Sequence, residues 1–168
     1  MLDIKSQIHV SIDKPKPELI NSIEPVKSLN KKPSGGFWTS SKYYDGDMIT
    51  SEWVEWAKGN LSRYDNKDMY VWELTVDNPC KVLKLNTKED IIEHSQKYTD
   101  SFQNEHYDFD WKYIYTELDC DAIWLTETGV RNLCSILIKR EYSMSSWDVD
   151  SMLWSDWKFS NVEKVRKL

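Results

Sequence analysis

The run Gly35-Gly36-Phe37-Trp38-Thr39-Ser40-Ser41 combines residue types that can hold a flat ligand. Glycines let a backbone approach another group closely, because no Cβ stands in the way. If the run is extended, alternation places Gly36, Trp38 and Ser40 on one face. That face then offers a gap, a large π surface and a hydroxyl group in succession. The same pattern also fits a core strand that begins at a glycine turn, and the run alone does not separate the two interpretations.

Two other polar features could act together with this run. His9 and Ser11 share the polar face of an alternating segment at residues 8–12, which predicts a first strand. A late segment, residues 147–154, predicts a strand that places Asp148 and Asp150 on one face. An exposed sheet edge is the alternative explanation for this aspartate pair.

Several well-defined kinds of site are not signalled by the sequence. It contains no Gly-x-Gly-x-x-Gly, no Gly-x4-Gly-Lys-Ser/Thr, no His-Glu-x-x-His and no Gly-x-Ser-x-Gly. The three histidines, His9, His94 and His106, lack the spacing of metal ligands. Two aspartate pairs could bind a hard cation if folded together, with helix capping and turns as the alternative. These pairs are Asp108 with Asp110 and Asp119 with Asp121.

Composition narrows the class of protein. The 168 residues suit one domain, residues 1–168. Nine tryptophans and nine tyrosines exceed what a core of this size needs, and they suit flat ligands, interfaces or an aromatic-heavy core. The net charge of −6 disfavours a broad phosphate-binding surface, because non-specific nucleic-acid affinity comes from clustered Lys and Arg. A local basic cluster, Lys27, Lys31 and Lys32, is interpreted as a solvated loop.

Cysteine usage and hydropathy indicate in which cellular compartment the protein is expected. Three widely spaced cysteines without a Cys-x-x-Cys motif argue against a disulfide framework and for a reducing compartment. No apolar run approaches the ~18 residues of a membrane span, and the N-terminus lacks the apolar core of a signal peptide. We therefore expect a cytoplasmic protein without membrane association, although an effector exported without a signal peptide would look the same.

The order of elements predicts an α+β fold with a split mixed or antiparallel sheet and short helices. We expect strands over residues 8–12, 36–40, 69–76, 81–85, 120–126, 135–138 and 147–154. Helices are expected over 18–23, 51–58, 89–98, 108–118 and 127–133, with loops at 42–48 and 99–107 and an exposed tail at 161–168. In the second of these helices, Trp53, Trp56 and Ala57 share a face. This face packs on the core, or one indole covers the face formed by Trp38.

Taken in order, three short pieces resemble the mono-ADP-ribosyltransferase fold. They are Ile8-His9-Val10-Ser11, Gly-Gly-Phe-Trp-Thr-Ser and Asp148-Val149-Asp150-Ser151-Met152-Leu153. In that superfamily an early strand presents a His or Arg that anchors the dinucleotide, a second strand supports the nicotinamide ribose, and a carboxylate opens a late strand. The pieces cover most of the chain in order, and the second is the most specific.

The resemblance implies NAD as a substrate, no metal, and a role for each matching residue. His9, with Ser11 beside it, would anchor the adenosine side. Gly36, Trp38 and Ser40 would face the nicotinamide ribose, with Trp53 covering them, while Phe37 and Thr39 point into the core. Asp150 would stabilise the positive charge that develops on the sugar as the nicotinamide bond breaks.

One departure from the family pattern affects the catalytic position. The family carboxylate is usually Glu, and Asp150 is shorter by one methylene. Three outcomes stay open: the backbone compensates, Asp148 shares the role, or the protein is a weak or inactive relative. We expect Asp150→Ala to remove activity with little loss of stability.

The resulting expectation is an NAD-dependent mono-ADP-ribosyltransferase of the toxin or phage-conflict effector type. Its partners would be NAD, a protein or nucleic-acid acceptor, and an antitoxin or inhibitor, with the acceptor chosen by loops at 42–50 or 99–107. The alternatives are an NAD glycohydrolase on the same fold and a non-catalytic, aromatic-rich binding module.

Overall fold

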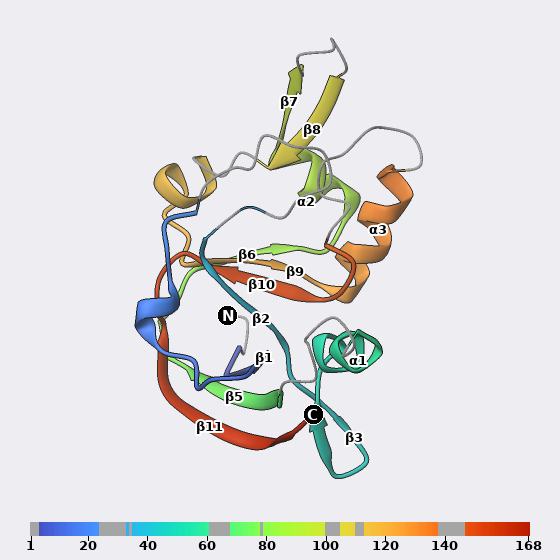
Figure 1. Cartoon of the computed structure of the whole chain (residues 1–168). Coiled ribbons are helices and arrows are strands. Elements are labelled where there is room, and N and C mark those ends of the chain that lie inside the picture. The colour runs from blue at the N-terminus through green and yellow to red at the C-terminus, as the bar shows by residue number, and fades with distance from the viewer. Residues whose placement is uncertain are drawn as a thin grey trace.

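A seven-stranded mixed sheet forms the centre of the computed structural model (Figure 1). The structure describes residues 4–23, 33, 35–60, 68–77, 79–99, 105–109, 113–137 and 147–168. The sheet order is β11-β5-β1-β2-β10-β9-β6, and only the β6–β9 pair is parallel. These strands are β1 (Ser6–Ser11), β2 (Phe37–Ser41), β5 (Tyr70–Val76), β6 (Val82–Leu85), β9 (Ala122–Leu125), β10 (Ser151–Trp154) and β11 (Phe159–Lys167).

Two small hairpins and three short α-helices complete the described fold. The hairpins pair β3 (Tyr43–Asp45) with β4 (Met48–Thr50), and β7 (Ser95–Thr99) with β8 (Glu105–Phe109). The helices are α1 (Glu52–Gly59), α2 (Lys88–Glu93) and α3 (Glu127–Leu137). A 3₁₀ turn covers Pro17–Leu19 and a π-helical turn covers Tyr113–Glu117. The predicted α+β class with a mixed sheet and short helices is therefore confirmed.

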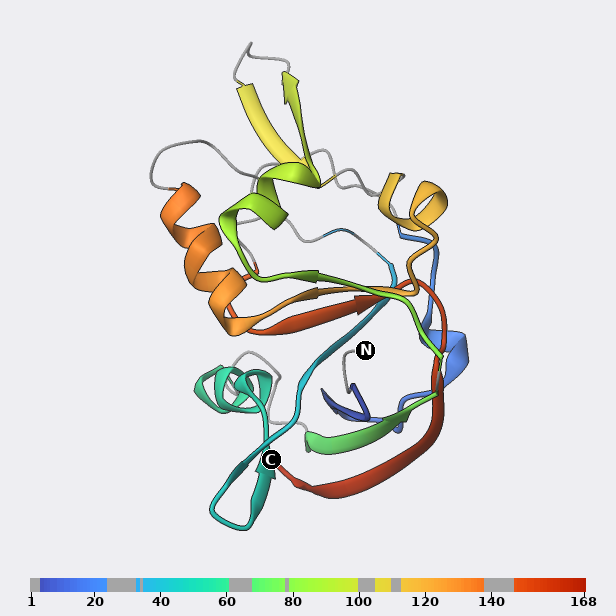
Figure 2. The ribbon, with the colours of Figure 1, turned by 180° about the vertical axis from the view of Figure 1, so that it is seen from behind.

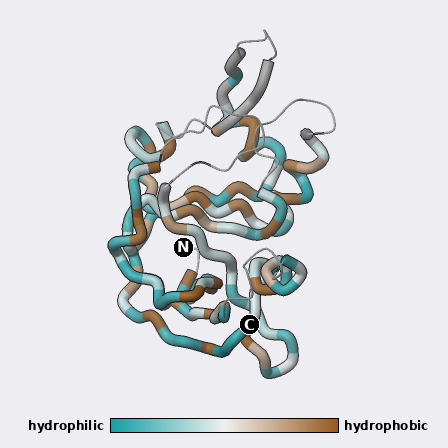
Figure 3. Tube along the Cα trace, viewed as in Figure 1, coloured by the Kyte–Doolittle hydropathy of each residue, from teal (hydrophilic) through white to brown (hydrophobic). Residues whose placement is uncertain are grey.

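Apolar residues cover both faces of the sheet. Strands β10, β2, β1, β5 and β11 curve around the N-terminus, while α2 and α3 lie on the other side of β9 and β10 (Figures 1 and 2). One core cluster, which includes Phe37, Trp72 and Trp154, fills the inside of this curve. A second, which includes Leu125 and Leu133, lies beneath α2 and α3. The hydropathy colouring follows this arrangement, with brown along β9 and β10 and mostly teal along the edge strand β11 (Figure 3).

The glycine pair before β2 allows other segments of the chain to pack closely against it. Gly35 and Gly36 both have positive φ, at 82° and 64°. A Cβ on Gly36 would lie 2.4 Å from the Leu153 side chain and 2.9 Å from the Trp154 carbonyl oxygen. A Cβ on Gly35 would meet the Ser22 carbonyl oxygen at 2.0 Å. The space beside the glycines is thus filled by the protein's own chain, which corrects the expectation that Gly36 leaves a gap for a ligand.

The strand register assigns residues to the two faces of the sheet. Met152 lies opposite Thr39 on one side and Trp124 on the other, so these three side chains share a face. Ile8 lies opposite Ser40, which puts both on the other face. By alternation, His9 belongs with Thr39, and Trp38 belongs with Ser40.

Several predicted elements are wrong, and each has a local reason. Of the helix expected at 108–118, the described residues form the end of β8 and a single π-helical turn at Tyr113–Glu117, so the apolar spacing of Ile114, Tyr115 and Leu118 reflects one turn. In place of the strand expected at 135–138, the described residues 135–137 form the end of α3, whose apolar positions continue the helical period. The tail lies at the surface as expected, with no buried residue over 161–168, and it forms most of β11, an edge strand paired with β5 whose lysines and arginine suit such an edge.

Two predicted loops and one predicted helix also differ from the structure. Residues 42–48 form most of the β3–β4 hairpin, which turns at Gly46 with φ 59°. The predicted 99–107 loop contains the end of β7 and the start of β8. The helix expected at 89–98 begins as predicted, with a capping box between Thr87 and Asp90, but it ends at Glu93 because β7 follows.

Some sequence features fall outside the described residues. They are the basic cluster Lys27, Lys31 and Lys32, together with Asp110 and Trp111. Within the described part of the chain, none of the helices has the length and apolar character needed to cross a bilayer.

Candidate functional site

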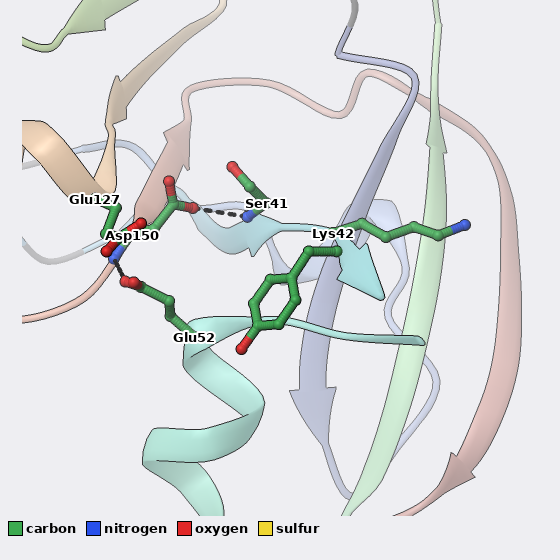
Figure 4. Close-up of a pocket in the computed structure, with 6 residues that line it drawn as sticks. Ser41, Lys42, Glu52, Glu127 and Asp150 are labelled. Atoms are coloured by element: carbon green, nitrogen blue, oxygen red, sulfur yellow. Dashed lines mark hydrogen bonds between the residues drawn. The ribbon is translucent and has the colours of Figure 1, made fainter. Parts of the chain in front are cut away.

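Three strand ends meet at one edge of the sheet and form a pocket. Because β10 runs antiparallel to both β2 and β9, the last residues of those two strands lie beside the first residues of β10. The pocket has a volume of about 410 Å³. Its lining residues are Ser41, Lys42, Tyr43, Glu52, Glu127 and Asp150 (Figure 4). The sheet topology therefore gathers residues that are distant in sequence.

Asp150 is held tightly at this edge, with 6% of its surface exposed. Its Oδ1 accepts a hydrogen bond of 2.8 Å from the Ser41 backbone N–H. Its Oδ2 accepts one of 2.9 Å from Trp124 Nε1. Ser40 Oγ donates to the Asp150 carbonyl oxygen at 2.8 Å. Since both carboxylate oxygens are engaged, we now expect Asp150→Ala to cost more stability than the little loss expected from the sequence.

The other two carboxylates come from the first turns of helices. Ser51 caps α1 by accepting from Val54 N–H, and Glu52 follows it. Glu127 occupies the first turn of α3, where Thr126 Oγ1 accepts from the Gly129 N–H. A carboxylate in the first helical turn interacts favourably with the helix dipole. These two helices thus bring negative charge to the same edge at which Asp150 lies.

The electrostatics of the pocket favour protonation of Glu52. Burial raises the pKa of the Glu52 carboxyl, and the hydrogen bond from the Asp150 backbone N–H opposes that shift. The charges of Asp150 and Glu127 raise the pKa further. The pKa of the Tyr43 phenol is also raised, first by burial and then by Glu55 and Glu52. The pocket therefore has a negative potential that suits a positively charged group.

His9 lies on β1 and contacts β2 and α1 rather than the pocket lining. Its ring centroid is 4.7 Å from that of Phe37 and 5.7 Å from that of Trp53. Its Nδ1 lies 2.8 Å from the Trp38 carbonyl oxygen. Because a carbonyl oxygen only accepts, Nδ1 must carry the proton and donate. Burial lowers the pKa of His9 to about 4, against the effect of this hydrogen bond, so His9 is neutral at pH 7 and Nε2 is an acceptor.

The low pKa of His9 predicts a loss of stability in acid. The unfolded chain binds a proton near pH 6.5, whereas folded His9 binds one only near pH 4. The contribution of neutral His9 is therefore complete above pH 6.5, and about 3 kcal/mol of it is lost as the pH falls to 4. Urea unfolding between pH 4 and 8 measures this, with His9→Gln as the comparison, because glutamine can still donate to the Trp38 carbonyl. An identical pH dependence in both proteins would contradict the prediction.

The structure separates most of the other predicted site residues from the pocket. Ser40 is fully buried, and Trp38 packs on Trp147 with ring centroids 4.8 Å apart. The expected ligand face therefore packs on the core, with Trp38 half-buried, and Asp150 contacts Trp124 on the opposite, Thr39 face. Ser11 Oγ donates to the Asp13 carbonyl oxygen in the turn after β1.

The remaining predicted residues also lie apart from the pocket lining. Trp53 packs edge-on against His9, where the sequence analysis expected it to cover Trp38. Asp148 is exposed and does not line the pocket, so its expected sharing of the catalytic role lacks support. Of the predicted catalytic pair, only Asp150 lines the pocket.

The sequence analysis missed Glu52, Glu127 and Tyr43 as pocket residues. The available signal was a hydroxyl cap followed by a glutamate, at Ser51-Glu52 and at Thr126-Glu127. That signal identifies helix starts, but only the pairing of β10 with both β2 and β9 brings the two starts together.

Two of the aspartates considered as cation ligands, Asp119 and Asp121, form ion pairs with lysines. Asp119 pairs with Lys81 at 2.5 Å, and Asp121 pairs with Lys158 at 3.1 Å. The described residues include no group of three or more His, Cys, Asp or Glu side chains arranged to hold a metal ion. The described residues therefore do not assemble the cation site that was considered as one possibility for these aspartates.

Comparison with known proteins adds no relative. No family model, no curated protein and no solved structure matches the chain.

Proposed function

We propose that this protein transfers ADP-ribose from NAD to a macromolecular acceptor. One observation carries the proposal: Asp150 is hydrogen-bonded to the end of β2 at a pocket, across 109 residues of sequence, and His9 lies on the adjacent strand β1. The sequence pieces that resemble mono-ADP-ribosyltransferases thus lie on the contiguous strands β1, β2 and β10.

The charge of the pocket suits the reacting end of NAD. The nicotinamide ring of NAD is cationic, and positive charge develops on the ribose as the glycosidic bond breaks. Carboxylates placed in a partly desolvated pocket stabilise both charges. Tyr43 supplies the aromatic surface that the sequence analysis had assigned to Trp38. The phosphates of NAD would lie outside this acidic lining.

The test is nicotinamide release from NAD by the purified protein. We expect release that increases when cell lysate supplies an acceptor, together with an NAD-dependent rise in melting temperature. Labelled NAD followed by mass spectrometry of the protein and nucleic-acid fractions identifies the acceptor. Release at the same rate with and without lysate indicates a glycohydrolase. Absence of both release and a thermal shift overturns the proposal.

One observation favours a second candidate, a non-catalytic binding module. The β3–β4 hairpin exposes Tyr43, Tyr44 and Met48, with 42%, 63% and 39% of their surfaces accessible. Exposed aromatic residues on a hairpin can anchor a partner protein. This candidate predicts that Tyr44→Ala abolishes partner capture while NAD has no effect on melting temperature.

A further inference from the structure

The three carboxylates of the pocket differ in the groups that engage their oxygens. Both oxygens of Asp150 accept hydrogen bonds, from Ser41 N–H and Trp124 Nε1. Glu127 is largely exposed and forms an ion pair with Arg131, one helical turn further along α3. Asp150 therefore has no spare carboxylate oxygen, and Glu127 is engaged in an exposed ion pair on its own helix.

Glu52 combines one carboxylate oxygen that is fixed beside Asp150 with a second oxygen that no described residue binds. Its Oε2 accepts a hydrogen bond of 2.6 Å from the Asp150 backbone N–H, which fixes the carboxylate beside Asp150. Among the described residues, Oε1 of Glu52 has no hydrogen-bond partner. In Figure 4 the Glu52 side chain extends from α1 toward Asp150, whereas the Lys42 amine points away. Lys42 is instead bound to Glu73 at 2.5 Å, so it does not neutralise Glu52.

We propose that Glu52 is the group in this pocket that accepts the proton of the attacking nucleophile. The inference rests on the proposed function and deepens it, because the sequence analysis assigned no proton acceptor. It also gives the two carboxylates separate tasks. Asp150, held by Ser41 and Trp124, provides a fixed negative charge for the sugar, while the spare oxygen of Glu52 takes the proton.

The proposed step balances in atoms and charge. The bond between the ribose C1′ and the nicotinamide nitrogen breaks, and its electron pair leaves with the ring as neutral nicotinamide. A bond forms between C1′ and an N–H or O–H nucleophile of the acceptor. The proton of that nucleophile passes to Oε1 of Glu52, and solvent then removes it. No oxidant, reductant or metal takes part in this step.

The charged groups around Glu52 determine how the transfer rate is expected to depend on pH. Asp150 at the start of β10 and Glu127 on α3 disfavour its charge, whereas Arg131 on α3 favours it. The Tyr43 phenol on β3 also interacts with Glu52. A proton acceptor works only when ionised, so the transfer rate falls as the pH drops through the raised pKa of Glu52.

The experiment compares Glu52→Gln with the matched control Glu55→Gln. Glu55 lies on the same helix but pairs with Lys58 and does not line the pocket. We expect Glu52→Gln to lower the rate of acceptor labelling by about 10²-fold or more and to remove the acid limb of the pH profile. Glu55→Gln should retain the rate and the acid limb. The glutamine side-chain oxygen can still accept from the Asp150 N–H, so NAD binding and melting temperature should change little.

Chemical rescue of a second variant, Glu52→Ala, gives another readout in case Glu52→Gln does not fold. Added formate should restore labelling by Glu52→Ala, because a small carboxylate can enter the space that the side chain leaves. A structural role would not respond to formate. The inference is overturned if the wild-type protein is active and Glu52→Gln keeps its rate and acid limb, or if Glu127→Gln reproduces the loss instead. A wild-type protein that releases no nicotinamide points to failure of the proposed function itself.

Discussion

Asp150→Asn is expected to slow nicotinamide release by about 10²- to 10³-fold, the size of effect seen when a preorganised electrostatic group is removed. It is also expected to destabilise the fold by about 2–3 kcal/mol. The carboxylate accepts from Ser41 N–H and from Trp124 Nε1. An asparagine must turn its NH₂ toward one of these donors and leave that buried contact unsatisfied. Thermal unfolding would show a fall of roughly 5–10 °C for a domain of this size.

A double variant separates the chemical loss from the structural loss. Trp124→Phe removes the Nε1 donor, so the asparagine NH₂ no longer faces another donor on the Oδ2 side. Asp150→Asn should therefore cost less stability in the Trp124→Phe background than in the wild-type background. Activity should remain lost in the double variant, because the negative charge is still absent. Recovery of activity together with stability would show that Asp150 acts only through the fold.

Gly36→Ala is expected to destabilise the protein by about 3 kcal/mol, through backbone strain and overpacking. The φ of 64° disfavours any residue with a Cβ. The added carbon would also approach the Trp154 carbonyl oxygen at 2.9 Å, and the Leu153 side chain more closely still. A backbone oxygen within a paired strand has little freedom to move. Urea or thermal unfolding measures the loss, which corresponds to a drop of roughly 6–12 °C.

Gly46→Ala is the matched control for this prediction. Gly46 has nearly the same φ, 59°, but a Cβ there would have no neighbour within 4 Å. It should therefore show only the strain of the left-handed backbone, about 1–2 kcal/mol. If the two alanine variants unfold alike, the close packing of β2 on β10 does not contribute to stability.

The sequence predicts elements well where the signal is local. The alternating and β-branched residues of β1, β2 and β5 predict strands close to those observed, and Ser51 caps α1 as expected. The helix expected at 108–118 shows that apolar spacing alone does not determine the type or length of a helix. Trp111, Ile114 and Leu118 fit a helical period, yet the helical part among the described residues of this segment is one π turn, Tyr113–Glu117.

The candidate site is less predictable, because strand pairing decides it. The sequence identified Asp150 and the end of β2, but alternation alone did not establish which face of β2 would meet Asp150. The register of Met152 against both Thr39 and Trp124 decides that, and it favours the face opposite Trp38. Glu52 and Glu127 lie at helix starts that look ordinary in sequence. Their partnership depends on a sheet order that no local pattern specifies.

The position of β10 between β2 and β9 also dictates when the pocket can form during synthesis. Ser40 and Asp150 are 110 residues apart, so the ribosome needs roughly 5–20 s to add the second after the first. During that interval β2 has no neighbour on its β10 side, and Asp150 does not yet exist. A nascent chain is therefore incapable of the chemistry proposed here until β10 has been synthesised and has paired with β2.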